Sequence, residues 1–352
     1  MTFSFNESFC GSVPTLITPF GEDGRIDWPA VDMIVEYHIA AGCAGIFSPC
    51  LSSEMYELSP EERLELAERV YARAAGRCAV LATGTYGGSL EEMAETVKAM
   101  STRCDAVVVV TCLLAAEADD DATWLGSARR LLELTPGVPL GTYECPVPYK
   151  RVLSPDVMRW MAGSGRFRFH KDTCCDLPQM QAKIGAVREA EAEAGTGGFA
   201  FFNANVETLL PSLLAGAAGF SGISANFYPH LHVFLCEQAR RLGTDAAARP
   251  RSDLEAVQDF LSLAEATVCV HYPLSAKSYL RLVYASEAAA DAPPMLLRPG
   301  CRKAALKGLA LEPFQCEALL AMGRTQRKLS TSLGVVEIDP ATAAPAQVQQ
   351  GE

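Results

Sequence analysis

Short apolar runs alternate with amphipathic stretches over the first two thirds of the chain. Runs such as 79–83 and 106–110 are apolar on both faces, which is typical of strands buried in a parallel sheet. Between such runs, Ser59 and Ser89 precede acidic first turns and mark helix starts. The pattern predicts eight strands separated by helices, at 11–20, 44–48, 79–83, 106–110, 139–143, 167–171, 198–202 and 218–223.

Eight strand–helix units of about thirty residues favour a closed ring over an open sheet. We therefore predict a (β/α)8 TIM barrel over residues 1–225. Residues 226–335 carry helical patterns and no strand pattern, so they are expected to form a C-terminal helical extension. The remaining residues, 336–352, are rich in Ala, Pro and Gln and are expected to be a disordered tail.

Charge and hydropathy narrow the range of partners. The net charge of −12 and the pI near 5.0 argue against binding to nucleic acid or to an anionic membrane surface. The most apolar run, 106–116, is too short to cross a bilayer, and the first residues lack a basic and apolar signal. We expect a cytoplasmic protein whose partners are small molecules or further copies of itself.

The 13 cysteines form no C-x-x-C pair, which favours reduced thiols over a disulfide framework. Cys174 and Cys175 are adjacent, but no histidine stands at zinc-ligand spacing from them. His230 and His232 are two residues apart in a predicted helix and face different ways. The sequence therefore predicts no metal site.

Polar side chains follow three of the predicted strands, and the carboxyl ends of barrel strands meet at one mouth. Lys171 ends the alternating strand 167–171; a lysine buried there loses its proton readily and can attack a carbonyl to form an imine. Tyr143 offers a phenol for proton transfer, and Ser52 and Ser53 offer hydroxyl and N–H donors for a carboxylate. The alternatives are a lysine paired with Asp172, an ordinary buried tyrosine and a helix-entry loop.

Four further segments point to a known family. They are 13–20, which reads V-P-T-L-I-T-P-F; the loop 45–59 with Ser52 and Glu54; 171–180 around the lysine; and 213–219, followed by Asn226. In this order along the barrel they resemble the dihydrodipicolinate synthase and N-acetylneuraminate lyase family of class I aldolases.

The resemblance implies a 2-oxo acid, commonly pyruvate, bound as an imine to Lys171, with its carboxylate held by Ser52 and Ser53. Tyr143 would donate and accept protons, and Thr173 would contact the substrate. It also implies that no metal or organic cofactor is needed and that the protein is a homo-oligomer, either a dimer or a tetramer.

The chain departs from the family where proton-relay hydroxyls are usual. Leu51 stands in place of a hydroxyl residue, and Leu113 and Leu114 follow the fourth strand in place of tyrosines. Glu144 and Pro148 stand where the synthases carry Asn and Arg, which disfavours dihydrodipicolinate synthesis.

Glu144 is the new ionisable group beside Tyr143, and we predict that it replaces the missing relay. The alternative is a salt bridge to Lys150 or Arg168.

Asn203, Asn205 and Glu207 follow the seventh strand, where the lyases bind the polyol part of sugar acids. Their donors and acceptors suit a hydroxylated substrate, although Asn205 also suits a helix cap. His170 should point away from the mouth, because neighbouring strand residues face opposite sides.

Three functions remain open. The leading hypothesis is a Schiff-base lyase or aldolase that cleaves or forms a C–C bond of a 2-oxo acid. The second is an enzyme that forms the same imine but then dehydrates or decarboxylates its substrate, as relatives of the same fold do. The third is a non-catalytic barrel that binds a small acid, which the leucines at the relay positions favour.

Overall fold

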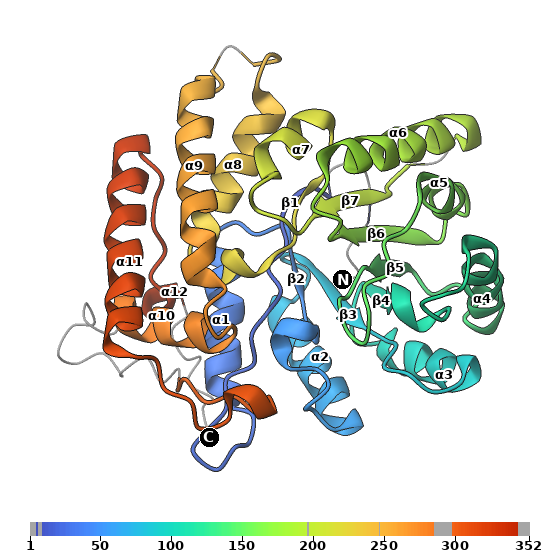
Figure 1. Ribbon diagram of the computed structural model, residues 1–352, viewed down its shortest axis with the longest axis horizontal. Coiled ribbons are helices and arrows are strands. Elements are labelled where there is room, and N and C mark those ends of the chain that lie inside the picture. Colours follow the sequence, from blue (N-terminus) through green and yellow to red (C-terminus); the bar gives the residue numbers. More distant parts are fainter. Residues whose placement is uncertain (1–4, 6–8, 196, 246, 285–297, 344–352) are drawn as a thin grey trace, which may run out of the picture.

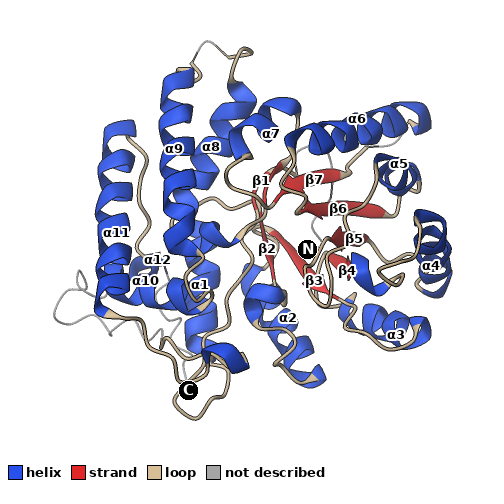
Figure 2. Cartoon of the chain, viewed as in Figure 1, coloured by secondary structure: helices blue, strands red, loops and turns tan. Residues whose placement is uncertain are grey.

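The computed structural model describes residues 5, 9–195, 197–245, 247–284 and 298–343. Eight parallel strands occupy the centre, and helices surround them (Figures 1 and 2). Each strand pairs with the next strand in the chain from β2 to β8, and β8 pairs with β1. The strands are β1 (Gly11–Ser12), β2 (Gly45–Phe47), β3 (Ala79–Thr83), β4 (Ala106–Val110), β5 (Leu140–Tyr143), β6 (Phe167–Asp172), β7 (Ala200–Asn203) and β8 (Gly219–Phe220).

The first predicted strand, 11–20, is regular only at its start. Beyond Ser12 it meets β2 through a single parallel bridge between Thr15 and Phe47, which brings the two ends of the sheet together. Pro14 and Pro19 carry no N–H group, so a continuous ladder cannot form here. The predicted (β/α)8 barrel is confirmed, with a seam between β1 and β2.

Two barrel helices begin where the sequence predicted, directly after Ser59 and Ser89. Ser59 and Ser89 each accept a hydrogen bond from the backbone three residues on, and Glu62 and Glu92 complete the two capping boxes. The helices are α1 (Trp28–Ala40), α2 (Pro60–Ala74), α3 (Leu90–Met100), α4 (Asp121–Leu134), α5 (Pro155–Gly163), α6 (Leu177–Ala194), α7 (Leu209–Ala215) and α8 (Pro229–Arg241).

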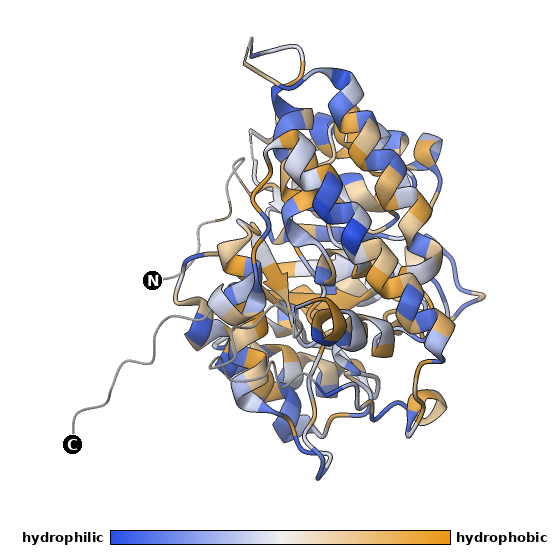
Figure 3. Ribbon diagram, turned by 90° about the vertical axis from the view of Figure 1, so that its left-hand side faces the viewer, coloured by the Kyte–Doolittle hydropathy of each residue, from blue (hydrophilic) through white to orange (hydrophobic). Residues whose placement is uncertain are grey.

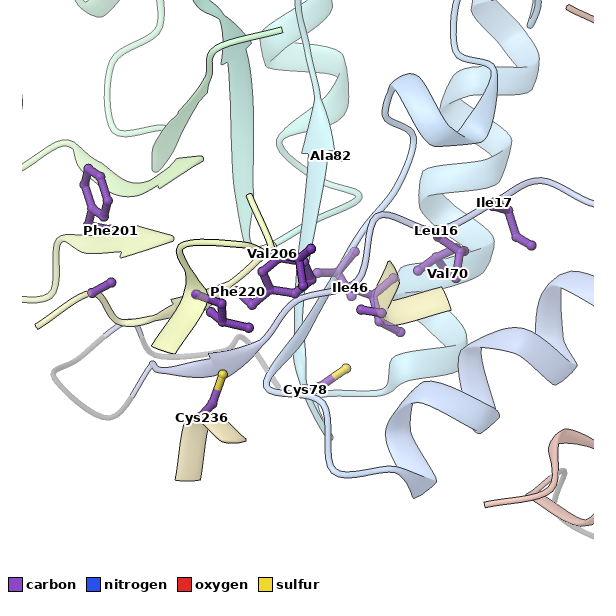
Figure 4. Close-up of a cluster of buried hydrophobic side chains, with 14 of the residues drawn as sticks. Leu16, Ile17, Ile46, Val70, Cys78, Ala82, Phe201, Val206, Phe220 and Cys236 are labelled. Carbon is purple, nitrogen blue, oxygen red and sulfur yellow. The ribbon is translucent and has the colours of Figure 1, made fainter. Parts of the chain in front are cut away.

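Strand alternation divides the core into two layers. In β4, Val108 and Val110 face the barrel interior, whereas Val107 and Val109 face the helices. Apolar colouring is therefore concentrated on the central strands in Figure 3, while the helices carry both kinds of residue. Figure 4 shows side chains of the outer layer, which come from strands, loops and helices; Leu16, Ile46 and Val70 are among them.

The boundary of the barrel differs from the prediction. Helix α8 packs against β1 and α7, where the eighth barrel helix belongs, so the barrel reaches Arg241 rather than residue 225. The extension consists of α9 (Arg251–Val268), α10 (Leu274–Tyr284) and α11 (Pro313–Leu333), beside α8 and away from α3 to α6 in Figure 1.

A further helix, α12 (Pro340–Ala343), packs against α1 and α10, within the stretch expected to be a disordered tail. Residues 344–352 of that stretch lie outside the described residues. Among the residues that the structure describes, no helix is both long enough and apolar enough to cross a membrane.

Candidate active site

Lys171 and Tyr143 lie side by side at the carboxyl ends of two paired strands. The register of β5 and β6 sets Tyr143 opposite Lys171, and strand alternation points both side chains into the barrel. Lys171 Nζ is 4.5 Å from the centre of the Tyr143 ring and 5.9 Å from that of Phe47. The structure thus brings the predicted amine and the predicted phenol together.

Both side chains face a cavity of about 350 Å³ at the mouth of the barrel. This volume suits a small metabolite. The lining combines polar groups with apolar ones from the barrel and from the extension: Leu51, Ser52, Glu54, Tyr56, Glu57, Tyr143, Val147, Lys171, Ile223, Tyr272, Pro273 and Lys303.

Burial controls the protonation of Lys171, whose side chain is only 4% exposed. Loss of water around the ammonium lowers its pKa to about 8, although the nearby thiols of Cys50 and Cys145 act in the opposite direction. Burial also raises the pKa of Tyr143 well above its ordinary value, so its phenol stays protonated. The site therefore pairs an amine that readily becomes neutral with a phenol that holds its proton.

The two predicted serines have different surroundings. Ser52, on the short 3-10 turn η1 (Leu51–Ser53), lines the cavity and donates a hydrogen bond to Thr15 Oγ1 at 2.9 Å. The Ser53 hydroxyl is fully buried; it donates to Leu16 O at 2.6 Å and accepts from Cys50 N at 3.1 Å. Ser53 thus holds the loop to the first strand segment and is not among the described residues that line the cavity.

Glu144 points away from the cavity, into a buried ionic cluster behind the strands. Its Oε1 accepts hydrogen bonds from Lys183 Nζ at 2.8 Å and from Leu153 N at 2.9 Å. The same Lys183 nitrogen lies 2.5 Å from Asp172 Oδ2. The partner of Glu144 is therefore Lys183, and the carboxylate is not aimed at Lys171, as a relay would require.

His170 completes this cluster of Glu144, His170, Asp172 and Lys183. Its Nε2 lies 3.5 Å from Glu144 Oε1 and 3.8 Å from Asp172 Oδ2, and its Nδ1 bonds to Thr142. Burial by itself would raise the pKa of Glu144, but His170 and Lys183 outweigh it and hold that pKa below its usual value.

Three of these residues, Glu144, His170 and Asp172, hold ligand atoms within 4.8 Å of one another, a spacing that would suit a metal ion. The Lys183 ammonium, however, contacts both carboxylates and already supplies a positive charge to them. The cluster is thus a buried salt bridge directly behind the two residues of the site.

The remaining predicted substrate contacts are engaged in local structure. Thr173 donates from its backbone N–H and its hydroxyl to Glu144. Asn203 donates to Thr208 and Ser212, and Asn205 accepts from Thr208 N at 3.1 Å and contacts Glu207. None of Thr173, Asn203, Asn205 and Glu207 is among the described residues that line the cavity. Asn205 does not cap α7, whose N-cap residue is Thr208; its side chain instead closes the turn that precedes the helix.

Leu51 and Leu113 are two of the leucines that stand where the resemblance implies relay hydroxyls. Leu51 lines the cavity, and Leu113 packs against the apolar barrel interior. Neither side chain can carry a proton. The site therefore has Tyr143 close to the amine but no hydroxyl at Leu51.

Glu54 ties the barrel mouth to the extension. Its buried carboxylate accepts hydrogen bonds from Lys277 Nζ at 2.8 Å, from Arg302 N at 2.6 Å and from Lys303 N at 2.7 Å. Lys277 lies on α10, and the other two residues belong to the segment that leads to α11. We call this set of contacts the Glu54 clamp; it holds Lys303 at the cavity.

Sequence reasoning missed the part of the lining that the extension supplies. Tyr272 and Pro273 come from the loop between α9 and α10, and Lys303 from the segment before α11. No spacing pattern marks them, because their place depends on how the extension packs. Ile223 could have been predicted as a lining residue, because it ends the last predicted strand.

Taken together, the fold and the cavity define a (β/α)8 barrel whose site is built around a buried lysine at the end of β6. The chain belongs to the dihydrodipicolinate synthetase family, which it matches over residues 8–281.

A 4-hydroxy-tetrahydrodipicolinate synthase of Laribacter hongkongensis is 26% identical over 253 residues, covering 70% of this chain and 80% of the relative. A monomeric dihydrodipicolinate synthase variant superposes with a TM-score of 0.76 at 17% identity, over 95% of this chain and 99% of its own. A sialic acid aldolase of Ruminococcus gnavus, mutated at its catalytic lysine, superposes with a TM-score of 0.71 at 15% identity. The superposition covers 93% of this chain and 98% of the aldolase chain. At these identities the two solved structures show a common fold.

Proposed function

We propose that the protein is a lyase of the Schiff-base type that cleaves or forms a C–C bond of a 2-oxo acid with a pyruvate-type donor. The observation that carries the proposal is Lys171 Nζ, 4.5 Å from the Tyr143 ring in the mouth cavity, with a pKa lowered to about 8 by burial. Membership of the family and the activity named for the Laribacter relative support the same class of chemistry.

The neutral amine of Lys171 attacks the ketone carbon of the acid, and loss of water from the resulting carbinolamine gives the imine. Once protonated, the imine withdraws electrons from the carbon next to it. The bond between that carbon and the following, hydroxyl-bearing carbon breaks, its electron pair forms the enamine double bond, and the hydroxyl loses its proton to give an aldehyde. The reverse sequence forms the bond. Tyr143 first donates the proton that leaves with the carbinolamine hydroxyl as water, and the phenolate so formed then takes the proton that the substrate hydroxyl loses. Ser52 binds the carboxylate. These steps need no metal or organic cofactor.

The first test is reductive trapping. Incubation with pyruvate and borohydride should fix the imine as a secondary amine, and peptide mass spectrometry should find the adduct on Lys171. A panel of other 2-oxo acids then identifies the preferred donor. If no 2-oxo acid gives an adduct, the enzyme assignment is wrong and the small-acid binder, which Leu51 favours, takes its place.

The pH dependence of trapping follows from the pKa of Lys171. Attack requires the neutral amine, whose fraction rises with pH up to a pKa of about 8. Below that value the initial rate should rise about tenfold per pH unit, and above it the rate should level off. Initial rates with excess cyanoborohydride from pH 6 to 10 measure the midpoint. A midpoint near the ordinary lysine pKa would mean that burial does not activate this amine.

Aldol addition needs an aldehyde partner, whereas dehydration and decarboxylation release water or CO2 from the 2-oxo acid alone. Assay of the trapped 2-oxo acid against aldehyde partners, with products read by mass spectrometry, decides among them. A homo-oligomer and a cytoplasmic location stay predictions from the sequence.

A further inference from the structure

A group of hydroxyls lies at the end of the cavity where η1 meets the extension. Thr15, Ser52 and Tyr272 contribute the oxygens, and Asn226 links two of these residues. Ser52 Oγ donates to Thr15 Oγ1 at 2.9 Å, while Asn226 Nδ2 donates to Tyr272 OH at 2.9 Å and to Thr15 O at 2.8 Å. Thr15, Ser52 and Asn226 are buried and Tyr272 is half-buried, so this group is held in place by the fold.

None of the three hydrogen bonds just described uses the proton of the Tyr272 hydroxyl. Because the phenol oxygen already accepts from Asn226, its own O–H can be given to another acceptor. Burial raises the pKa of Tyr272, although the hydroxyls of Ser52 and Thr15 act in the opposite direction, so the phenol is neutral and serves as a donor. Tyr272 lines the same cavity as Ser52 and Lys171.

Of the two predicted carboxylate donors, Ser52 and Ser53, only Ser52 is among the described residues that line the cavity. The Ser53 hydroxyl donates to Leu16 O and is fully buried, so Ser52 is the predicted serine that lines the cavity, and its proton must turn from Thr15 Oγ1 to reach a ligand. A carboxylate has two oxygens and is bound best by more than one donor. Tyr272, from the loop between α9 and α10, supplies a second donor from the extension.

We propose that Tyr272 is a substrate-binding residue, whose hydroxyl acts with that of Ser52 to hold the carboxylate of the 2-oxo acid. This inference rests on the proposed function and adds a specificity determinant from outside the barrel. A ligand with a carboxylate next to its ketone contacts both hydroxyls while its ketone meets Lys171. A ketone without a carboxylate gains nothing from Tyr272.

The test is the concentration dependence of trapping in Tyr272→Phe, which removes one hydroxyl and keeps the ring. The pyruvate concentration that half-saturates adduct formation on Lys171 should rise about 10- to 100-fold, because a hydrogen bond to a charged group is lost. The maximal trapping rate should change little. With methyl pyruvate, whose carboxylate is masked as an ester, the variant and the unaltered protein should give matching curves.

Tyr86→Phe is the matched control, since the Tyr86 hydroxyl donates to Thr83 O at 2.8 Å outside the cavity lining. It should leave half-saturation by pyruvate unchanged. A second comparison introduces Ser52→Ala into the unaltered protein and into Tyr272→Phe. If both hydroxyls bind one carboxylate, the two changes in half-saturation by pyruvate should not be additive. Thermal melting verifies that each variant is folded at the assay temperature, and Tyr272→Leu replaces the phenylalanine variant if that one is not.

The outcomes separate the two proposals. If the unaltered protein traps no 2-oxo acid, the proposed function itself fails. If it traps pyruvate and Tyr272→Phe shows the same half-saturation, only the role of Tyr272 is overturned. A lower maximal rate at unchanged half-saturation, or an equal shift with methyl pyruvate, also overturns carboxylate binding.

Discussion

Replacing Lys171 by methionine should abolish the borohydride-stable adduct and lower turnover of the preferred 2-oxo acid by at least about 10³-fold, because the buried amine beside Tyr143 is removed and Lys303, which also lines the cavity, is exposed. The same variant should be more stable than the unaltered protein at pH 7. Below its folded-state pKa of about 8 the buried ammonium bears its full desolvation cost, up to about 3 kcal/mol, and methionine removes that cost. Intact-mass measurements and thermal melting at pH 7 test both effects.

A gain in stability in Lys171→Met would show that the variant loses its activity because the amine is missing and not because the protein is unfolded. Between pH 8 and the ordinary lysine pKa, the folded protein releases the proton that the unfolded chain still holds. Stability of the unaltered protein should therefore rise with pH in that window, and the advantage of the variant should shrink. Lys307→Met, at an exposed lysine, is the control and should retain the adduct. An adduct of the same yield in Lys171→Met would refute the assignment of the amine.

Replacing Lys183 by methionine should cost about 3–5 kcal/mol of unfolding free energy. The Lys183 ammonium is fully buried and contacts both Glu144 and Asp172, so its loss leaves two buried carboxylates without their cation. Thermal and urea unfolding measure the change. Adding Glu144→Gln to this variant should recover part of the loss, because one uncompensated charge is then removed.

An exposed ion pair of the same length provides the comparison. Lys98 lies 2.8 Å from Glu95 on α3, but both side chains are exposed, so Lys98→Met should change stability by less than about 1 kcal/mol. Equal losses in the two variants would show that burial does not set the strength of the Lys183 contacts.

Strand periodicity carried the sequence predictions furthest. Placing Tyr143 and Lys171 at the ends of neighbouring strands was sufficient to bring them together in the barrel. The same alternation that turns His170 outward also turns Glu144 away from the mouth, since Glu144 follows an inward tyrosine. Assigning Glu144 as a relay overlooked this consequence of the pleat.

Lys183 was also detectable. It lies on α6 within a stripe of buried positions, Met180, Ile184 and Val187, and a lysine in such a stripe calls for a buried acidic partner. The orientation of the Ser53 hydroxyl and the position of Tyr272 were not detectable in this way. Each depends on contacts between segments far apart in the chain, for which no periodic pattern exists.

The Glu54 clamp implies that the extension is an integral part of the catalytic unit rather than an attachment to it. A chain cut after α8 would expose a carboxylate buried against α10 and would lose both Tyr272 and Lys303 from the mouth. If Tyr272 binds the carboxylate as proposed, a change in the loop between α9 and α10 alters ligand preference while the strands that present the lysine stay constant.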